Sequence, residues 1–222
     1  MTKKKMMALM TSLLLVILVI AGCGNKSVSA EKAGSLLIDR FVYDKESKAF
    51  KTTFSNAKEL EKQANDIKDA FTEGFLTSAA GNMGLTDEDT DQLFESFMGS
   101  VKEKASYKIK EVSKDKDSVE LEVAVTGLDF TAVLKAYGAD LQKQAMKHPD
   151  LDQAEALEMM LKSFTTAIEN AEATDEPVIV SLTLEKEQNK WTVDDAAMKE
   201  ISVIFIATLL GVEDFADISL ED

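Results

Sequence analysis

The chain has 222 residues, a net charge of −15 and a single cysteine, Cys23. A lone cysteine cannot form an internal disulfide, so the fold has to be stabilised by its core, and this length can supply one. Strong acidity argues against nucleic acid as a partner, and against anionic lipid as a partner of the folded part, because both are attracted to basic patches.

The first residues have the three parts of an export signal. Three lysines come first, an apolar run interrupted only by Thr11 and Ser12 extends from Met6 to Gly22, and small residues close it. The run is a little short for a membrane span, which needs about 20 residues. The pattern therefore predicts a cleaved export signal.

The residues Ile20-Ala21-Gly22-Cys23 resemble the lipobox of bacterial lipoproteins. The resemblance implies cleavage between Gly22 and Cys23 and a diacylglyceryl group on the Cys23 sulfur, and two acyl chains anchor a protein stably. We expect a protein held by this lipid on the extracytoplasmic face of the cell membrane. The alternatives are an ordinary signal with an incidental cysteine, or an uncleaved span with Cys23 at the interface.

The chain then divides into three parts. Residues 1–22 are the predicted signal peptide, residues 23–31 the lipidated cysteine with a polar tether, and residues 32–222 one α+β domain.

Helical periodicity dominates the first half of the domain. Asn56 with Glu59 predicts a capping box, and Thr86 predicts the start of another helix, with acidic residues in its first turn. Three apolar stripes are expected to face the core: Ala33, Leu36, Leu37 and Phe41; Leu60, Ala64, Ile67, Phe71 and Phe75; Leu93, Phe94, Phe97, Met98 and Val101.

Two segments show the alternation of antiparallel strands with one wet face. The first runs from Tyr107 through a polar turn to Val125, and the second from Pro177 through another turn to Val193. Between them, two helical patterns meet at His148-Pro149 and predict a helical hairpin. After Asp194 comes a short helix that is apolar nearly all round, as expected of a core helix or a subunit contact. The fold class is therefore α+β: a curved antiparallel sheet of two hairpins, N-terminal helices, an inserted helical hairpin and a C-terminal apolar helix.

Motifs for catalysis or metal binding are weak. Asp87, Asp89 and Asp91 match the first positions of a calcium loop, but Gln92 and Met98 stand where that loop needs glycine and glutamate. The helix-start interpretation explains the same acids. We expect no metal site and no cofactor.

The single histidine and the single arginine also argue against common sites. His148 is expected at a helix end, without the partners of a catalytic triad. Arg40 is the sole arginine, so bidentate clamps for carboxylate or phosphate are not expected. We predict a non-enzymatic protein, although an enzyme that uses carboxylates alone stays open.

The order of elements resembles a group of Gram-positive surface lipoproteins. The resemblance is carried by the segments VELEVAVTGLDF and VIVSLTLEKEQNKWTVDD, and it implies a domain of unknown function over nearly the whole mature chain. The strand NKWTV is also similar to the last strand of cone-shaped folds like nuclear transport factor two, which implies a curved sheet around a pocket. Trp191, Tyr107 and Tyr137 are the candidate pocket residues.

The expected function is binding of an apolar small molecule or of a protein partner outside the cell membrane. A second hypothesis comes from the same resemblance, since some such lipoproteins release an apolar octapeptide from the signal as a pheromone. Here that peptide is LVILVIAG, residues 15–22.

Overall fold

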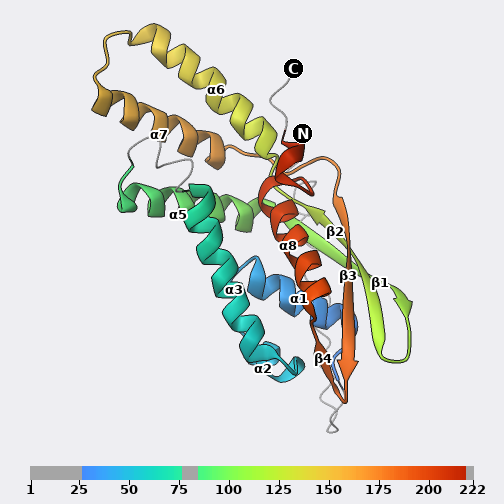
Figure 1. The fold of residues 1–222 in the computed structure, drawn as a ribbon. Helices are drawn as coiled ribbons and strands as arrows, with labels where there is room; N and C mark the ends of the chain where they lie inside the picture. Colours follow the sequence, from blue (N-terminus) through green and yellow to red (C-terminus); the bar gives the residue numbers. More distant parts are fainter. Residues whose placement is uncertain (1–26, 77–84, 219–222) are drawn as a thin grey trace, which may run out of the picture.

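The structure is a computed structural model that describes residues 27–76 and 85–218. The predicted signal peptide, Gly22, Cys23 and the candidate pheromone segment lie outside the described residues. Four antiparallel strands form an open sheet in the order β1-β2-β3-β4 (Figure 1). They are β1 (Ser106–Lys114), β2 (Ser118–Thr126), β3 (Val178–Glu187) and β4 (Lys190–Thr192).

Both predicted hairpins are present, with the register that the alternation of apolar residues requires. Tyr107 is opposite Val125 in the β1–β2 pair, and Leu121 is opposite Leu182 in the β2–β3 pair. The alternate residues of β2 from Val119 to Val125 are buried, whereas the residues between them are only partly covered. One face of the sheet is thus the core face.

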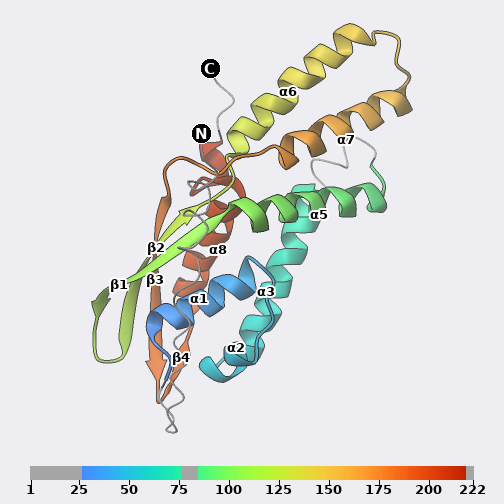
Figure 2. The same cartoon turned by 180° about the vertical axis from the view of Figure 1, so that it is seen from behind.

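Two helices cover that face, α1 (Ala30–Phe41) and α8 (Asp195–Leu210) (Figures 1 and 2). Asp194 caps α8 by accepting a hydrogen bond from the amide of Ala197, and Gly211 ends the helix with a left-handed backbone. Ile201, Ile204 and six further residues of α8 are buried, and the helix packs against α1, β2 and β3. The expectation of an apolar core helix is confirmed.

A second helical layer lies beside α1 and α8. It contains α2 (Lys48–Thr53), α3 (Ala57–Phe71), the short π-helix η1 (Thr72–Leu76) and α5 (Asp87–Lys104). The Thr86 hydroxyl accepts a hydrogen bond from the amide of Asp89, whose carboxylate accepts one from the amide of Thr86, so the predicted start of α5 is confirmed.

The capping box predicted at Asn56 is wrong. The Asn56 amide nitrogen donates to the carbonyl oxygen of Val193 at 2.8 Å. Its amide oxygen, the atom that would have to accept in a cap, makes no capping hydrogen bond and is buried without a partner among the described residues. The sequence also gave no warning of α2, a helix of six residues that Ser47 caps by accepting a hydrogen bond from the amide of Phe50.

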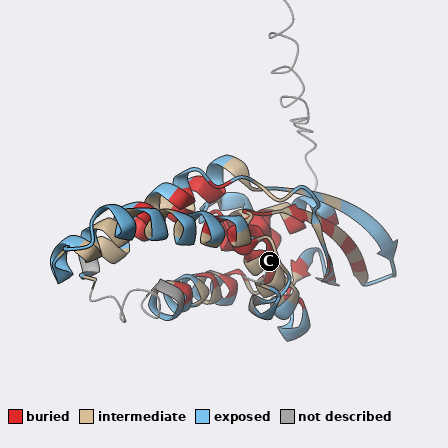
Figure 3. Ribbon diagram, turned by 90° about the horizontal axis from the view of Figure 1, so that it is seen from above, coloured by how far each residue is buried: buried red, intermediate tan, exposed pale blue. Residues whose placement is uncertain are grey.

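The predicted helical hairpin is present as α6 (Phe130–Lys147) and α7 (Gln153–Glu169), here called the α6–α7 arm. His148 follows the last turn of α6, as predicted. Figure 3 shows that burial along both helices is concentrated at the base of the arm. The buried residues there are Phe130, Val133, Ser163, Phe164, Ala167 and Ile168. A 3-10 turn, η2 (Phe215–Asp217), follows α8.

The predicted fold class is confirmed by this arrangement of helices around an open antiparallel sheet. Within residues 27–76 and 85–218, no helix combines the length and the apolar composition needed to cross a membrane.

Candidate functional site

A cavity of about 300 Å³ lies between the end of α1 and the helices α3, α5 and α8, and we call it the Arg40 pocket. Its size is at the small end of the range of ligand sites, which is roughly 300–1,000 Å³. It is lined by Arg40, Phe41, Val42, Asp44, Ala64, Lys68, Phe71, Phe94, Glu95, Met98, Gly99, Lys102 and Phe205.

Aromatic rings and a thioether form the apolar part of the lining. The ring of Phe71 lies 5.6 Å from that of Phe205, edge to face, and 6.4 Å from that of Phe94. Met98 is on α5 one turn after Phe94, so its flexible side chain lines the same wall. Such a surface favours a ligand with an apolar body.

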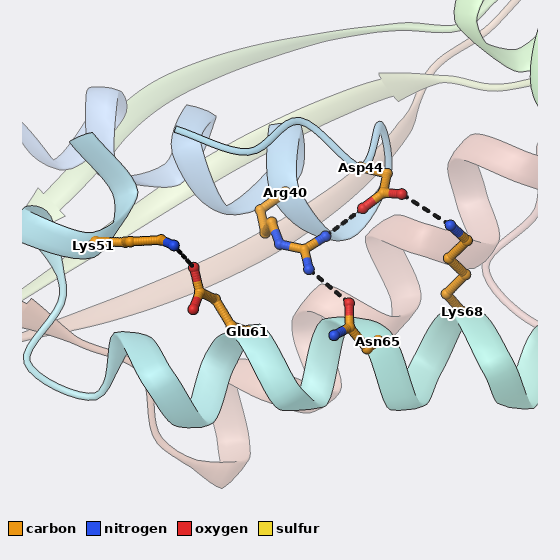
Figure 4. A network of polar contacts seen from close by, with 6 residues as sticks. All are labelled: Arg40, Asp44, Lys51, Glu61, Asn65 and Lys68. Atoms are coloured by element: carbon orange, nitrogen blue, oxygen red, sulfur yellow. Dashed lines mark hydrogen bonds and ion pairs between the residues drawn. The ribbon is translucent and has the colours of Figure 1, made fainter. Parts of the chain in front are cut away.

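Arg40 is the buried polar group of the pocket, with only 6% of its surface exposed. Its Nη1 donates to Asp44 Oδ1 at 2.5 Å and its Nη2 donates to Asn65 Oδ1 at 2.7 Å (Figure 4). Its Nε is buried and has no hydrogen-bond partner among the described residues. An unpaired buried donor costs about 1–3 kcal/mol, so this atom is a reason to expect a ligand group here.

Asp44 connects Arg40 to α3. Its second carboxylate oxygen accepts a hydrogen bond from Lys68 Nζ at 2.9 Å (Figure 4). Asp44 has a left-handed backbone, with φ of 51°, at the turn that follows α1. Few residues other than glycine adopt this conformation, and aspartate is one that tolerates it. Aspartate at this position therefore forms the turn and also supplies a carboxylate, which glycine would not.

The surroundings of Asp44 act on its pKa in both directions. Partial burial by itself raises the pKa of the carboxyl. The hydrogen bond and charge of Lys68 and the charge and hydrogen bond of Arg40 outweigh that effect, so the pKa lies below its ordinary value. Asp44 is thus ionised at neutral pH and bridges two cations.

Positive charge exceeds negative charge around this pocket, although the whole chain is strongly acidic. Arg40, Lys68 and Lys102 contribute three cations, and Asp44 and Glu95 contribute two anions. The Nζ of Lys102 has no hydrogen bond or ion pair among the residues that the structure describes. A small cationic excess beside an aromatic wall suits a ligand that is apolar at one end and anionic at the other.

The three predicted pocket residues lie at three separate places, and none of them lines the Arg40 pocket. Trp191 is buried in β4, and its Nε1 donates to the carbonyl oxygen of Val28 at 2.9 Å. It borders a small hollow of about 210 Å³ beside the β1–β2 turn. Tyr137 is on the α6–α7 arm, where its ring lies 5.1 Å from that of Phe164.

Tyr107 belongs to an open hollow on the other side of the turn after α1. Its ring lies 6.1 Å from that of Tyr43, and both rings line this hollow together with Asp39 and Lys102. Burial, followed by the charge of Asp39, raises the pKa of Tyr43 to about 12, and the same causes raise the pKa of Tyr107 further. Lys102 thus lines both hollows.

Two residues of the weak motifs have structural positions that explain them. Asp89 belongs to the capping box of α5, and His148 is exposed at the end of α6, beside a hollow between α6 and α7. Across the described ranges, no three histidine, cysteine, aspartate or glutamate side chains are arranged to hold a metal ion.

The sequence did not predict that Arg40 lines a pocket. As the sole arginine, Arg40 was only an argument against bidentate clamps for carboxylate or phosphate. A usable signal was present, because Arg40 occurs within the apolar stripe of α1, three residues after Leu37 and directly before Phe41. A charged residue on the buried face of a helix needs partners there. The identity of those partners, Asp44 and Asn65, depends on the packing of α1 against α3.

Comparison with known proteins gives one family and one structural likeness. No curated protein matches the chain. The chain resembles the crystal structure of YcdA, a candidate lipoprotein from Bacillus subtilis, with a TM-score of 0.57 and 17% identity over 79% of this chain and 55% of that one. It therefore spans about half the length of YcdA, and at this identity the likeness shows the fold alone.

The family is shown more directly, by a match over most of the chain. Residues 20–206 match the model of a domain of unknown function, DUF5105. The match includes the Ile20–Cys23 motif, both hairpins and the Arg40 pocket. Because it covers well over half of the sequence, the chain belongs to the DUF5105 family.

Proposed function

We propose that the chain is an extracytoplasmic lipoprotein, anchored through Cys23, whose domain binds a small apolar molecule in the Arg40 pocket without catalysing a reaction. The anchor is supported by the lipobox-like motif and by the likeness to a candidate lipoprotein. Binding is supported above all by a buried arginine with a free Nε in an aromatic pocket. The pheromone hypothesis concerns residues 15–22, which lie outside the described residues.

The anchor is tested by replacing its sulfur. Cys23→Ala removes the only thiol in the chain, so metabolic labelling with a radioactive fatty acid should be abolished and the protein should be unprocessed or released. Cys23→Ala protein that still enters the detergent phase with its signal removed would contradict the anchor.

The pocket is tested by filling it. Gly99 lines the pocket on α5, and a Cβ added there meets no atom within 4 Å. Gly99→Phe therefore adds a large ring to the pocket wall without a clash at its Cβ. It also removes a glycine from the interior of a helix, and this stabilises the folded state.

Gly138→Phe is the matched control, because Gly138 is in α6, lines none of the pockets described above and has equally open surroundings. The full acylated chain is placed in neutral phosphatidylcholine nanodiscs, and octanol is titrated by calorimetry, with protein-free nanodiscs as the blank. Binding should be lost in Gly99→Phe and kept in Gly138→Phe. Equal heats for wild type and Gly99→Phe would refute the pocket.

A further inference from the structure

We infer that the ligand of the Arg40 pocket carries a single anionic group, so that its class is the single-chain anionic amphiphile. The inference rests on the proposed function and adds to it the charge of the ligand and the residues that recognise it: Arg40, Lys68 and Lys102.

The buried guanidinium supplies the first reason. Its Nη1 and Nη2 donate hydrogen bonds to Asp44 and Asn65. The Nε, buried and unpartnered among the described residues, is left to donate to an acceptor that the protein does not provide. A carboxylate or phosphate oxygen is the acceptor that a guanidinium binds best, because the bond is assisted by charge.

The charges around the pocket supply the second reason. Asp44 is shared by Arg40 and Lys68, so this cluster of three keeps one positive charge. Lys102 and Glu95, on the facing helix α5, balance one another. One negative charge on the ligand would neutralise the remaining positive charge of this cluster. With a neutral ligand, the buried guanidinium would have only the Asp44 carboxylate as a counter-ion, and it shares that carboxylate with Lys68.

The position of the apolar wall supplies the third reason. Arg40 and Lys68 approach the cavity from α1 and α3, and Phe94 and Met98 approach it from α5. A ligand with an anionic head near Arg40 can therefore place its chain against the aromatic rings. A cavity of about 300 Å³ suits one short chain and is too small for a two-chain lipid.

The test compares two probes of equal chain length, octanoate and octanol, at pH 7.5, where the carboxylic acid is ionised. The full acylated chain in neutral nanodiscs is titrated with each probe. Lys68→Gln and Lys102→Gln remove one charge each, and both side chains are exposed enough for the fold to tolerate the change. Lys147→Gln, at the end of α6, is the control for a lost surface charge.

Each pocket variant should weaken octanoate binding about two- to fivefold, the range for partly exposed ion pairs, and leave octanol binding unchanged. Lys147→Gln should change neither. Octyl phosphate bound more tightly than octanoate, with the same loss in the variants, would identify phosphate as the preferred head and support the same class.

Two failures are distinguishable. If both probes bind wild type, both are lost in Gly99→Phe, and neither responds to the lysine variants, the inferred anionic group is wrong and the apolar pocket stands. If neither probe distinguishes wild type from Gly99→Phe, the proposed pocket function is wrong, and this inference fails with it.

Discussion

The indole nitrogen of Trp191 donates a hydrogen bond of 2.9 Å to the carbonyl oxygen of Val28, and this contact fastens the start of the domain to β4. Val28 follows Cys23 by five residues. Five residues span at most about 18 Å even when fully extended. If Cys23 carries the lipid, the β4 end of the sheet must therefore stay close to the membrane, and the α6–α7 arm, which projects from the other end of the sheet, must point away (Figures 1 and 2).

This orientation predicts efficient energy transfer from Trp191, the only tryptophan, to lipids with dansyl-labelled head groups. The acylated chain is inserted into labelled vesicles, and the quenching of tryptophan emission is measured. The comparison is a double variant, Trp191→Phe with Met146→Trp, which moves the donor to the arm at a position that is 72% exposed. Transfer should be weaker from position 146. Equal or stronger transfer from there would show that the arm faces the membrane.

Asp44 makes the stability of the protein sensitive to acid. Its pKa in the folded state is held below the ordinary value by Lys68 and Arg40 against the opposing effect of burial. The unfolded chain therefore takes up a proton first as the pH falls, and the stabilisation present above about pH 4 is lost progressively below it.

Asp44→Asn keeps a residue that tolerates a left-handed backbone but removes the titration. We expect it to be less stable than wild type at pH 7 and to lose less free energy of unfolding between pH 6 and pH 3, as measured by urea unfolding followed by circular dichroism. Parallel pH profiles for the two proteins would contradict this account. Asp66→Asn is a suitable control, since the Asp66–Lys62 pair is exposed on α3.

Because of its three tyrosines, we expect the protein to lose stability at high pH. Burial raises the pKa of Tyr43 to about 12, and it also raises the pKa values of Tyr107 and Tyr137. Because the unfolded chain ionises near pH 10, it releases protons first, and the free energy of unfolding falls as the pH rises from about 10 to 12.

Absorbance at 295 nm should therefore show less tyrosinate at pH 10.5 in the native protein than in the protein unfolded by urea. Tyr43→Phe removes one of the shifted groups, so its stability should fall less steeply over the same range. Identical tyrosinate fractions in native and unfolded protein would contradict the burial of these hydroxyls.

Local patterns predicted what depends on neighbours in the sequence. The alternation from Val119 to Val125 gave the strand and its buried face, and Thr86 with Asp89 gave the start of α5. Asn56 shows the limit of this reasoning, because its side-chain hydrogen bond goes to the carbonyl of Val193, which is distant in the sequence, and the predicted local cap is not formed. The Arg40 pocket is beyond the same limit, since four helices from separate parts of the chain line it.

Aromatic residues were a weak guide to the pocket for a related reason. Trp191 is held by Val28 and Tyr137 packs on Phe164, so each has a structural role in its own neighbourhood. Large side chains fill cores more often than they line ligand sites. The better signal was a charged residue in an apolar stripe, because its burial requires partners that the structure has to provide.

The connection between β2 and α6 gives the sharpest prediction about stability. Gly127 lies against α8, and a Cβ at this position would collide with the carbonyl oxygen of Ala207 and crowd Gly211. Both neighbours are backbone, so no side chain can turn away, and α8 would have to shift within the core. Gly127→Ala should therefore destabilise the protein by about 3 kcal/mol or more.

Gly138→Ala provides the matched comparison, because it makes the same change in an exposed helix with no atom within 4 Å of the new Cβ. It should leave stability unchanged or raise it by about 0.5–1 kcal/mol, the cost of glycine relative to alanine in a helix. Urea unfolding of both variants beside wild type measures the difference. A Gly127→Ala protein as stable as Gly138→Ala would mean that the β2–α6 connection does not pack against α8 as described.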